Sequence, residues 1–96
     1  MYLNGAIAGD SMMAGTAVCV GSRDYVRSVQ WHEDLAAVLG DLGGALQSFT
    51  ILRGDDDVAR VELQLLGGGT ARRSLHVRPE DDCVEVDRGA PLGSDG

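Results

Sequence analysis

Apolar and polar residues alternate most clearly between residues 48 and 87, in the stretch SFTILRGDDDVARVELQLLGGGTARRSLHVRPEDDCVEVD. Alternation with a period of two is typical of a β-strand with one buried face, and clusters of Gly, Pro and Asp are typical of turns. We therefore predict four strands separated by three turns. The strands are expected at 48–53, 58–66, 70–78 and 83–87, and the turns at 54–57, 67–69 and 79–82.

The turns also set the register of this antiparallel meander, because a slip of one residue moves every apolar side chain to the opposite face. A three-residue loop at 67–69 and a four-residue loop at 79–82 bring the apolar side chains into two rows on one face. One row is Phe49, Val61, Leu75 and Val86, and the other is Ile51, Ala59, Val77 and Val84. The opposite face is polar, as is common for an antiparallel sheet exposed to water.

An amphipathic helix is predicted at about 33–47, before the sheet. Its apolar residues recur at steps of three and four, and Glu33 and Asp34 suit the positive end of the helix dipole. The opposite side carries Ala36, Gly40 and Gly44, which is a spacing that allows close approach of another backbone. We therefore predict an interface there, either with the N-terminal segment or with a second subunit. Codon bias toward Gly and Ala is an equally good explanation.

The predicted fold class is α+β, with residues 1–87 forming a single domain in which the helix covers the apolar face of the meander. Residues 1–22 are rich in Gly and Ala, so periodicity does not distinguish helix from strand there. Thr16–Val20 and Tyr25–Trp31 are candidates for an additional N-terminal β-hairpin. Residues 88–96 follow no pattern, and we expect them to be a flexible C-terminal tail.

Fifteen acidic and eight basic residues give a formal charge of -7, which disfavours direct binding to nucleic acid. All the basic residues are arginine, as expected of a GC-rich bacterial or phage gene. Cys19 and Cys83 lack the spacing of a zinc site or a disulfide framework, and residues 1–22 lack the basic start of a signal peptide. We therefore expect a cytoplasmic protein with reduced cysteines, no cofactor and no membrane segment.

The hairpins bring two acidic turns to the same end of the predicted sheet. Such an edge attracts basic protein partners and speeds encounter with them. A Ca²⁺ or Mg²⁺ site and mimicry of DNA are weaker alternatives, because the acidic residues lack the spacing of an EF-hand and acidic proteins are common. The carboxylates concerned are Asp55, Asp56, Asp57, Glu80, Asp81 and Asp82, and we expect Arg60, Arg72, Arg78 and Glu85 on the polar face to help set specificity.

The sequence therefore predicts a non-enzymatic interaction module of the immunity, inhibitor or adaptor type that binds a basic protein surface. The first alternative is a phage or assembly protein that forms homo-oligomers. The second is a thiol-dependent enzyme, because His76 faces Glu85 across the last hairpin with Cys83 diagonal to it. An open sheet face lacks the concave pocket that catalysis needs, so we assign no catalytic residue and no metal ligand.

Overall fold

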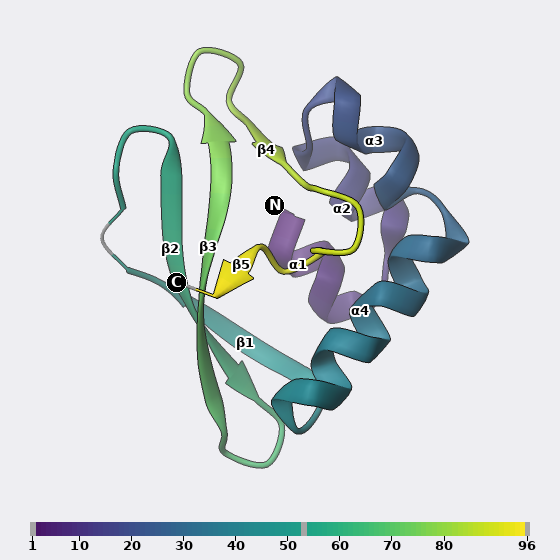
Figure 1. Cartoon of the computed structure of the whole chain (residues 1–96), viewed down its shortest axis with the longest axis vertical. Coiled ribbons are helices and arrows are strands. Elements are labelled where there is room, and N and C mark those ends of the chain that lie inside the picture. Colours follow the sequence, from purple (N-terminus) through teal and green to yellow (C-terminus); the bar gives the residue numbers. More distant parts are fainter. Residues whose placement is uncertain (1, 53, 96) are drawn as a thin grey trace.

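The computed structural model describes residues 2–52 and 54–95. Position 1 begins the predicted domain, position 53 ends the predicted first strand and position 96 ends the predicted tail, and these three positions lie outside the described residues. Within it, four helices precede an antiparallel sheet of five strands (Figure 1), which confirms the α+β class. The sheet order is β1-β2-β3-β4, and β5 also pairs with β3. The elements are α1 (Tyr2–Ala8), α2 (Ser11–Ala17), α3 (Val20–Val26), α4 (Val29–Leu42), β1 (Leu46–Ile51), β2 (Val58–Leu65), β3 (Thr70–Arg78), β4 (Cys83–Glu85) and β5 (Ser94–Asp95).

The N-terminal segment forms short helices, so the predicted hairpin at Thr16–Val20 and Tyr25–Trp31 is wrong. The carboxylate of Asp10 starts α2 by accepting hydrogen bonds from the backbone N–H groups of Met12 and Met13, at 3.0 and 3.1 Å. The small residues let α1 and α2 pack closely, since a Cβ added to Gly5 would lie only 2.5 Å from a backbone nitrogen of α2. Glycine and alanine here serve helix packing and not a strand.

Helix α4 begins four residues earlier and ends five residues earlier than the predicted helix at about 33–47. Ser28 caps its start, because the hydroxyl accepts from the backbone N–H of Trp31 at 3.4 Å. Gly43 ends it in the left-handed region at φ 103°, where the glycine N–H donates to the carbonyl of Leu39 at 3.1 Å. The chain is therefore free to enter β1 at Leu46.

The hairpin of β3 and β4 has the predicted register, with Val77 opposite Val84 and Arg78 opposite Cys83. The other two hairpins are displaced by two residues from the prediction. Val61 lies opposite Arg73 and not Leu75, and the β1 residues are likewise shifted along β2. Because the displacement is two residues, the faces are preserved, and the predicted apolar side chains remain on the inner face of the sheet.

The glycine-rich turn accounts for the displacement between β2 and β3. Leu65 donates its N–H to the carbonyl of Gly69 at 2.8 Å, so the loop consists of residues 66–68 and not 67–69. Gly67 and Gly68 have φ values of 112° and 100°, which glycine adopts readily. In the first hairpin, Asp55 and Val58 form an isolated β-bridge, so this turn also lies closer to β2 than the predicted turn at 54–57.

The core lies between the inner face of the sheet and the helices, with the last residues of the chain inserted between these layers (Figure 1). Tyr2 donates its hydroxyl proton to the carbonyl of Pro91 and accepts from the indole N–H of Trp31 at 2.9 Å. Leu92 is 1% exposed, and Asp95 of β5 forms an ion pair with Arg73 at 3.1 Å. In the described part of the predicted flexible tail (88–96), which is residues 88–95, the apolar side chains complete the core.

Candidate functional site

The two acidic turns lie at the same end of the sheet, where β1 meets β2 and β3 meets β4 (Figure 1). The N–H of Val77 donates to the carbonyl of Asp57 at 2.9 Å and so joins the first turn to β3. Asp82 adopts a left-handed φ of 51°, which aspartate tolerates better than most residues. The six carboxylates in these turns are all exposed: Asp55, Asp56, Asp57, Glu80, Asp81 and Asp82.

The charged residues predicted to set specificity lie on the outer face of the sheet and form exposed ion pairs. Arg78 contacts Glu85 through its Nε and Asp81 through Nη1, the second at 3.9 Å. Arg60 contacts Asp55 at 3.9 Å. Exposed pairs of this kind contribute about 0–1 kcal/mol each, so they hold the turns only weakly.

Arg72 stands apart from these residues. It pairs with Glu62 at 3.5 Å, near the opposite end of β2 and β3 from the acidic turns. The structure therefore brings Arg60, Arg78 and Glu85 to the acidic end of the sheet but does not bring Arg72 there.

Cys83 forms a disulfide bond with Cys19, and their Cα atoms are 5.0 Å apart. The expectation of reduced cysteines is therefore wrong. The bond joins the start of α3 to β4, and the N–H of Cys19 donates to the carbonyl of Val84 at 2.9 Å beside it. His76 does lie opposite Glu85, but the bonded sulfur of Cys83 is no nucleophile, so the enzyme alternative lacks its reactive group in this state.

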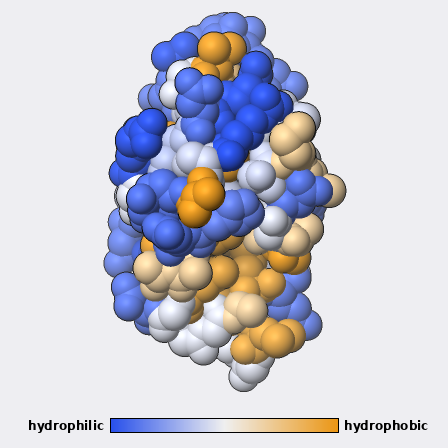
Figure 2. Space-filling view, turned by 90° about the vertical axis from the view of Figure 1, so that its right-hand side faces the viewer, coloured by the Kyte–Doolittle hydropathy of each residue, from blue (hydrophilic) through white to orange (hydrophobic). Residues whose placement is uncertain are grey.

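The predicted interface residues do not form one helical stripe. Ala36 and Gly40 are exposed on α4, whereas Gly44 follows the end of the helix, and an added Cβ there would lie 3.1 Å from the carbonyl oxygen of Leu66. The N-terminal segment leaves the α4 residues uncovered, so the intramolecular form of the prediction is wrong. Figure 2 views the molecule from the side on which α4 lies in Figure 1, and it shows hydrophobic residues gathered over the lower part of that side.

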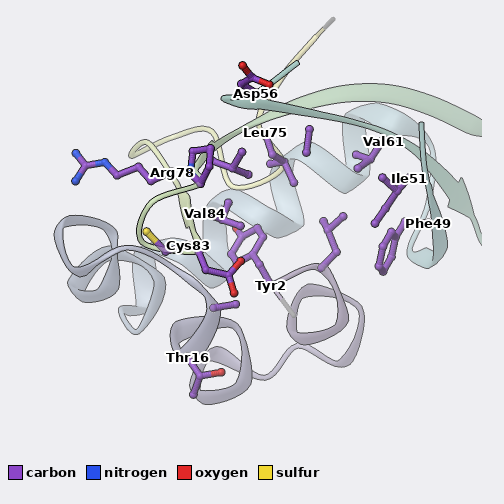
Figure 3. Close-up of a pocket in the computed structure, with 16 residues that line it drawn as sticks. Tyr2, Thr16, Phe49, Ile51, Asp56, Val61, Leu75, Arg78, Cys83 and Val84 are labelled. Atoms are coloured by element: carbon purple, nitrogen blue, oxygen red, sulfur yellow. The ribbon is translucent and has the colours of Figure 1, made fainter. Parts of the chain in front are cut away.

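The sequence reasoning missed a cleft of about 620 Å³ between the inner face of the sheet and helices α1 and α2. In Figure 3, Phe49, Ile51, Val61 and Leu75 point from the sheet toward the helices, and Tyr2 lies between the two layers. Volumes of about 300–1,000 Å³ are usual for ligand pockets. The cleft is therefore large enough to hold part of a ligand or of a partner protein.

The cleft exists because the helices cover only part of the sheet. The 14 residues of α4 extend about 21 Å, whereas the nine residues of β3 extend about 30 Å. Near α4 the inner residues Leu63 and Leu65 are 0% and 3% exposed, but Ile51, on the same face at the acidic end, is 60% exposed. The comparison of helix and strand lengths indicates that one such helix cannot cover the whole inner face, although it does not indicate which part stays uncovered.

Two carboxylates of the acidic turns line one end of this cleft, Asp56 and Asp82. Figure 3 shows Asp56 at the edge of the cleft, away from the apolar side chains, and Arg78 extending away from the cleft. This direction agrees with the ion pairs of Arg78 to Asp81 and Glu85. The mouth of the cleft is therefore acidic although its walls are apolar.

A second polar cluster joins α3, α4 and the segment after β4. Tyr25 donates to the carboxylate of Asp34 at 2.5 Å and accepts from the N–H of Gly89 at 3.1 Å, and Arg88 lies 5.5 Å from the centre of its ring. Burial, followed by the hydrogen bond to Asp34, raises the pKa of Tyr25 to about 12. The hydrogen bonds from Tyr25 and Gln30 lower the pKa of Asp34. These partners are all protein groups, so we interpret the cluster as structural.

Among the residues that the structure describes, no three His, Cys, Asp or Glu side chains lie close enough together to hold a metal ion. No helix in the described part of the chain is both long and apolar enough to cross a membrane. No protein-family model, curated protein or solved structure matches this chain. The function must therefore be argued from the acidic turns, the cleft and the exposed surfaces.

Proposed function

We propose that this protein is a non-enzymatic interaction module that binds a basic surface of another protein, in the manner of an immunity, inhibitor or adaptor protein. The observation that supports the proposal is the exposure of six carboxylates on two turns at one end of the sheet. Residues 52–57 and 78–83 together contain six acidic and two basic residues, a net charge of -4 within a total of -7. The negative charge is therefore concentrated where the sheet ends.

A concentration of charge at one end has a physical effect that the same charge spread evenly lacks. It orients an approaching basic partner as well as attracting it, and such steering raises association rates by roughly 10- to 1,000-fold at low salt. The disulfide bond and β4 anchor the second turn to the helical layer. The carboxylates of the second turn are thus presented by an anchored scaffold, which limits the entropy lost on binding.

The test compares two triple variants with the same change in net charge. One carries Asp55→Asn, Asp56→Asn and Asp57→Asn; the control carries Asp24→Asn, Glu33→Gln and Asp41→Asn, at exposed positions elsewhere. The probe is a fluorescent hexa-arginine peptide, followed by stopped-flow kinetics from about 20 to 200 mM salt. We expect the turn variant to bind about tenfold more slowly, with a flatter dependence on salt, and the control to remain within about twofold of the native protein.

Equal effects of the two triple variants would contradict the proposal, because they would show that total charge alone governs association. Amide chemical shifts in NMR spectra locate the probe independently of the kinetics. The proposal requires the largest changes in residues 54–57 and 79–82. Changes confined to the helices would contradict it.

A homo-oligomeric assembly protein is the second candidate, favoured by the exposed small residues of α4. A Cβ added at Gly40 would meet no atom within 4 Å, so another helix has room to approach. Analytical ultracentrifugation of the native protein and of Gly40→Arg tests this candidate. An oligomer that Gly40→Arg dissociates would support assembly through α4. A native protein that stays monomeric at about 100 µM, where even weak association is detectable, would reject this candidate.

A further inference from the structure

The cleft beside the acidic turns differs from an ordinary packing gap, because its walls include apolar side chains that remain open to solvent. Ile51 is on the same face as Val61, which is 2% exposed, yet Ile51 itself is 60% exposed. Ala59 and Val77 of the same wall are only half-buried. The opposite wall consists of Tyr2, Leu3, Thr16 and Ala17 of α1 and α2. An apolar group could therefore enter from outside without unfolding any element.

We infer that this cleft receives an apolar side chain of a basic partner segment, whose Arg or Lys side chains contact Asp56 and Asp82 at the mouth. The inference rests on the proposed function and specifies the partner: a segment with an aliphatic or aromatic residue flanked by cations. The apolar side chain inserts between β1–β3 and the helices α1 and α2. The cations remain at the surface, where they face the carboxylates of the two turns.

Charge complementarity favours this occupant over others. Among the described residues that line the cleft, Arg78 is the basic one, and its guanidinium is held by Asp81 and Glu85 on the outer face. The acidic mouth repels the carboxylate of a fatty acid and repels a second copy of this chain, which also carries a charge of -7. A cationic segment gains from both the apolar walls and the acidic mouth.

The test uses two labelled peptides that differ in one residue, Gly-Arg-Arg-Leu-Arg-Arg-Gly and the same peptide with Ala in place of Leu. Because the peptides carry equal charge, any difference in affinity reports the apolar contact. We expect the Leu peptide to bind the native protein about tenfold more tightly by fluorescence anisotropy. It should also shift the NMR signals of Phe49, Ile51 and Ala17, which the Ala peptide should leave nearly unchanged.

Two variants of the cleft and one control sharpen the result. Ile51→Ser makes an exposed part of the wall polar, and Ala59→Phe fills the cleft; both should reduce the difference between the peptides to about twofold or less. Val29→Ser is the control, because Val29 is also exposed, at 73%, and lies outside the cleft. It should retain the tenfold difference. Circular dichroism checks that the variants are folded. If Ala59→Phe does not fold, Ile51→Ser alone tests whether the cleft receives the Leu side chain.

The outcomes separate this inference from the proposed function. If the native protein binds both peptides equally while the Asp55–Asp57 variant loses both, the cleft inference is overturned and the proposed function stands. If the Asp55–Asp57 variant binds both peptides as tightly as the native protein, or the native protein binds neither, both are overturned. Displacement of the Leu peptide by equimolar laurate, or dimerisation that Ile51→Ser abolishes, would assign the cleft to a lipid or to a second copy and overturn the inference.

Discussion

Replacing both Cys19 and Cys83 by Ser should lower the free energy of unfolding by about 4 kcal/mol. The two cysteines are 64 residues apart in sequence. In the chain-entropy description, a bond that closes a loop of this length lowers the entropy of the denatured chain by about 14.5 cal/mol/K, or about 4.3 kcal/mol at 25 °C. For a domain of this size, the loss corresponds to a fall in Tm of roughly 15–30 °C.

The contacts beside the disulfide should keep the variant folded. Val18 and Val84 form a β-bridge, and the hydroxyl of Ser22 accepts from the N–H of Val86 at 2.8 Å. Urea denaturation followed by the fluorescence of Trp31, the single tryptophan, compares the native protein, the reduced native protein and the variant. The last two should agree within about 1 kcal/mol. A difference below about 1 kcal/mol between native protein and variant, or two reactive thiols in the folded native protein, would refute the reasoning.

Three further predictions concern the core and its polar contacts. Leu92→Ala should lower the free energy of unfolding by about 2–5 kcal/mol in urea denaturation, because the side chain is 1% exposed; a smaller loss would place it outside the core. Gly5→Ala should lower Tm sharply, since the added Cβ would lie 2.5 Å from the nitrogen of Ala14, whereas Gly21→Ala, with no atom within 4 Å, should not. Burial raises the pKa of Tyr25 from 10.0 to about 12, so the protein should lose stability as pH rises through this interval in pH-dependent urea titrations. Tyr25→Phe should weaken that dependence, and an unchanged pH profile would contradict the assignment.

The strands and their faces could be predicted because alternation and turn residues act locally. Pro79 and the acidic residues after it define one short loop, and the register of β3 and β4 follows from it. Three consecutive glycines are less restrictive, since any of them can adopt a positive φ, and the loop formed one residue earlier than predicted. The two strands then shift by two residues. Val61 lies opposite Arg73 and Ala59 lies opposite Leu75, but both side chains stay on the inner face.

The remaining features depend on contacts between distant parts of the chain. Nothing local distinguishes Gly5 and Ala14 as a helix contact from small residues in a strand. The pairing of Cys19 with Cys83 requires the fold to bring α3 to β4, and the position of Leu92 requires space left by other elements. Among the candidate site residues, the common end of the acidic turns follows from hairpin topology. The cleft does not, because it depends on where α1 and α2 leave the sheet uncovered.

The insertion of Leu92 between the sheet and the helices has a consequence for biosynthesis. A nascent chain that has left the ribosome only as far as β4 already contains all four helices and the four main strands, but Tyr2 still lacks the carbonyl of Pro91 and the centre of the molecule lacks a side chain. Such an intermediate exposes apolar surface that chaperones and proteases recognise. Folding of this domain is therefore completed only when residues 86–95, which follow β4, have left the ribosome.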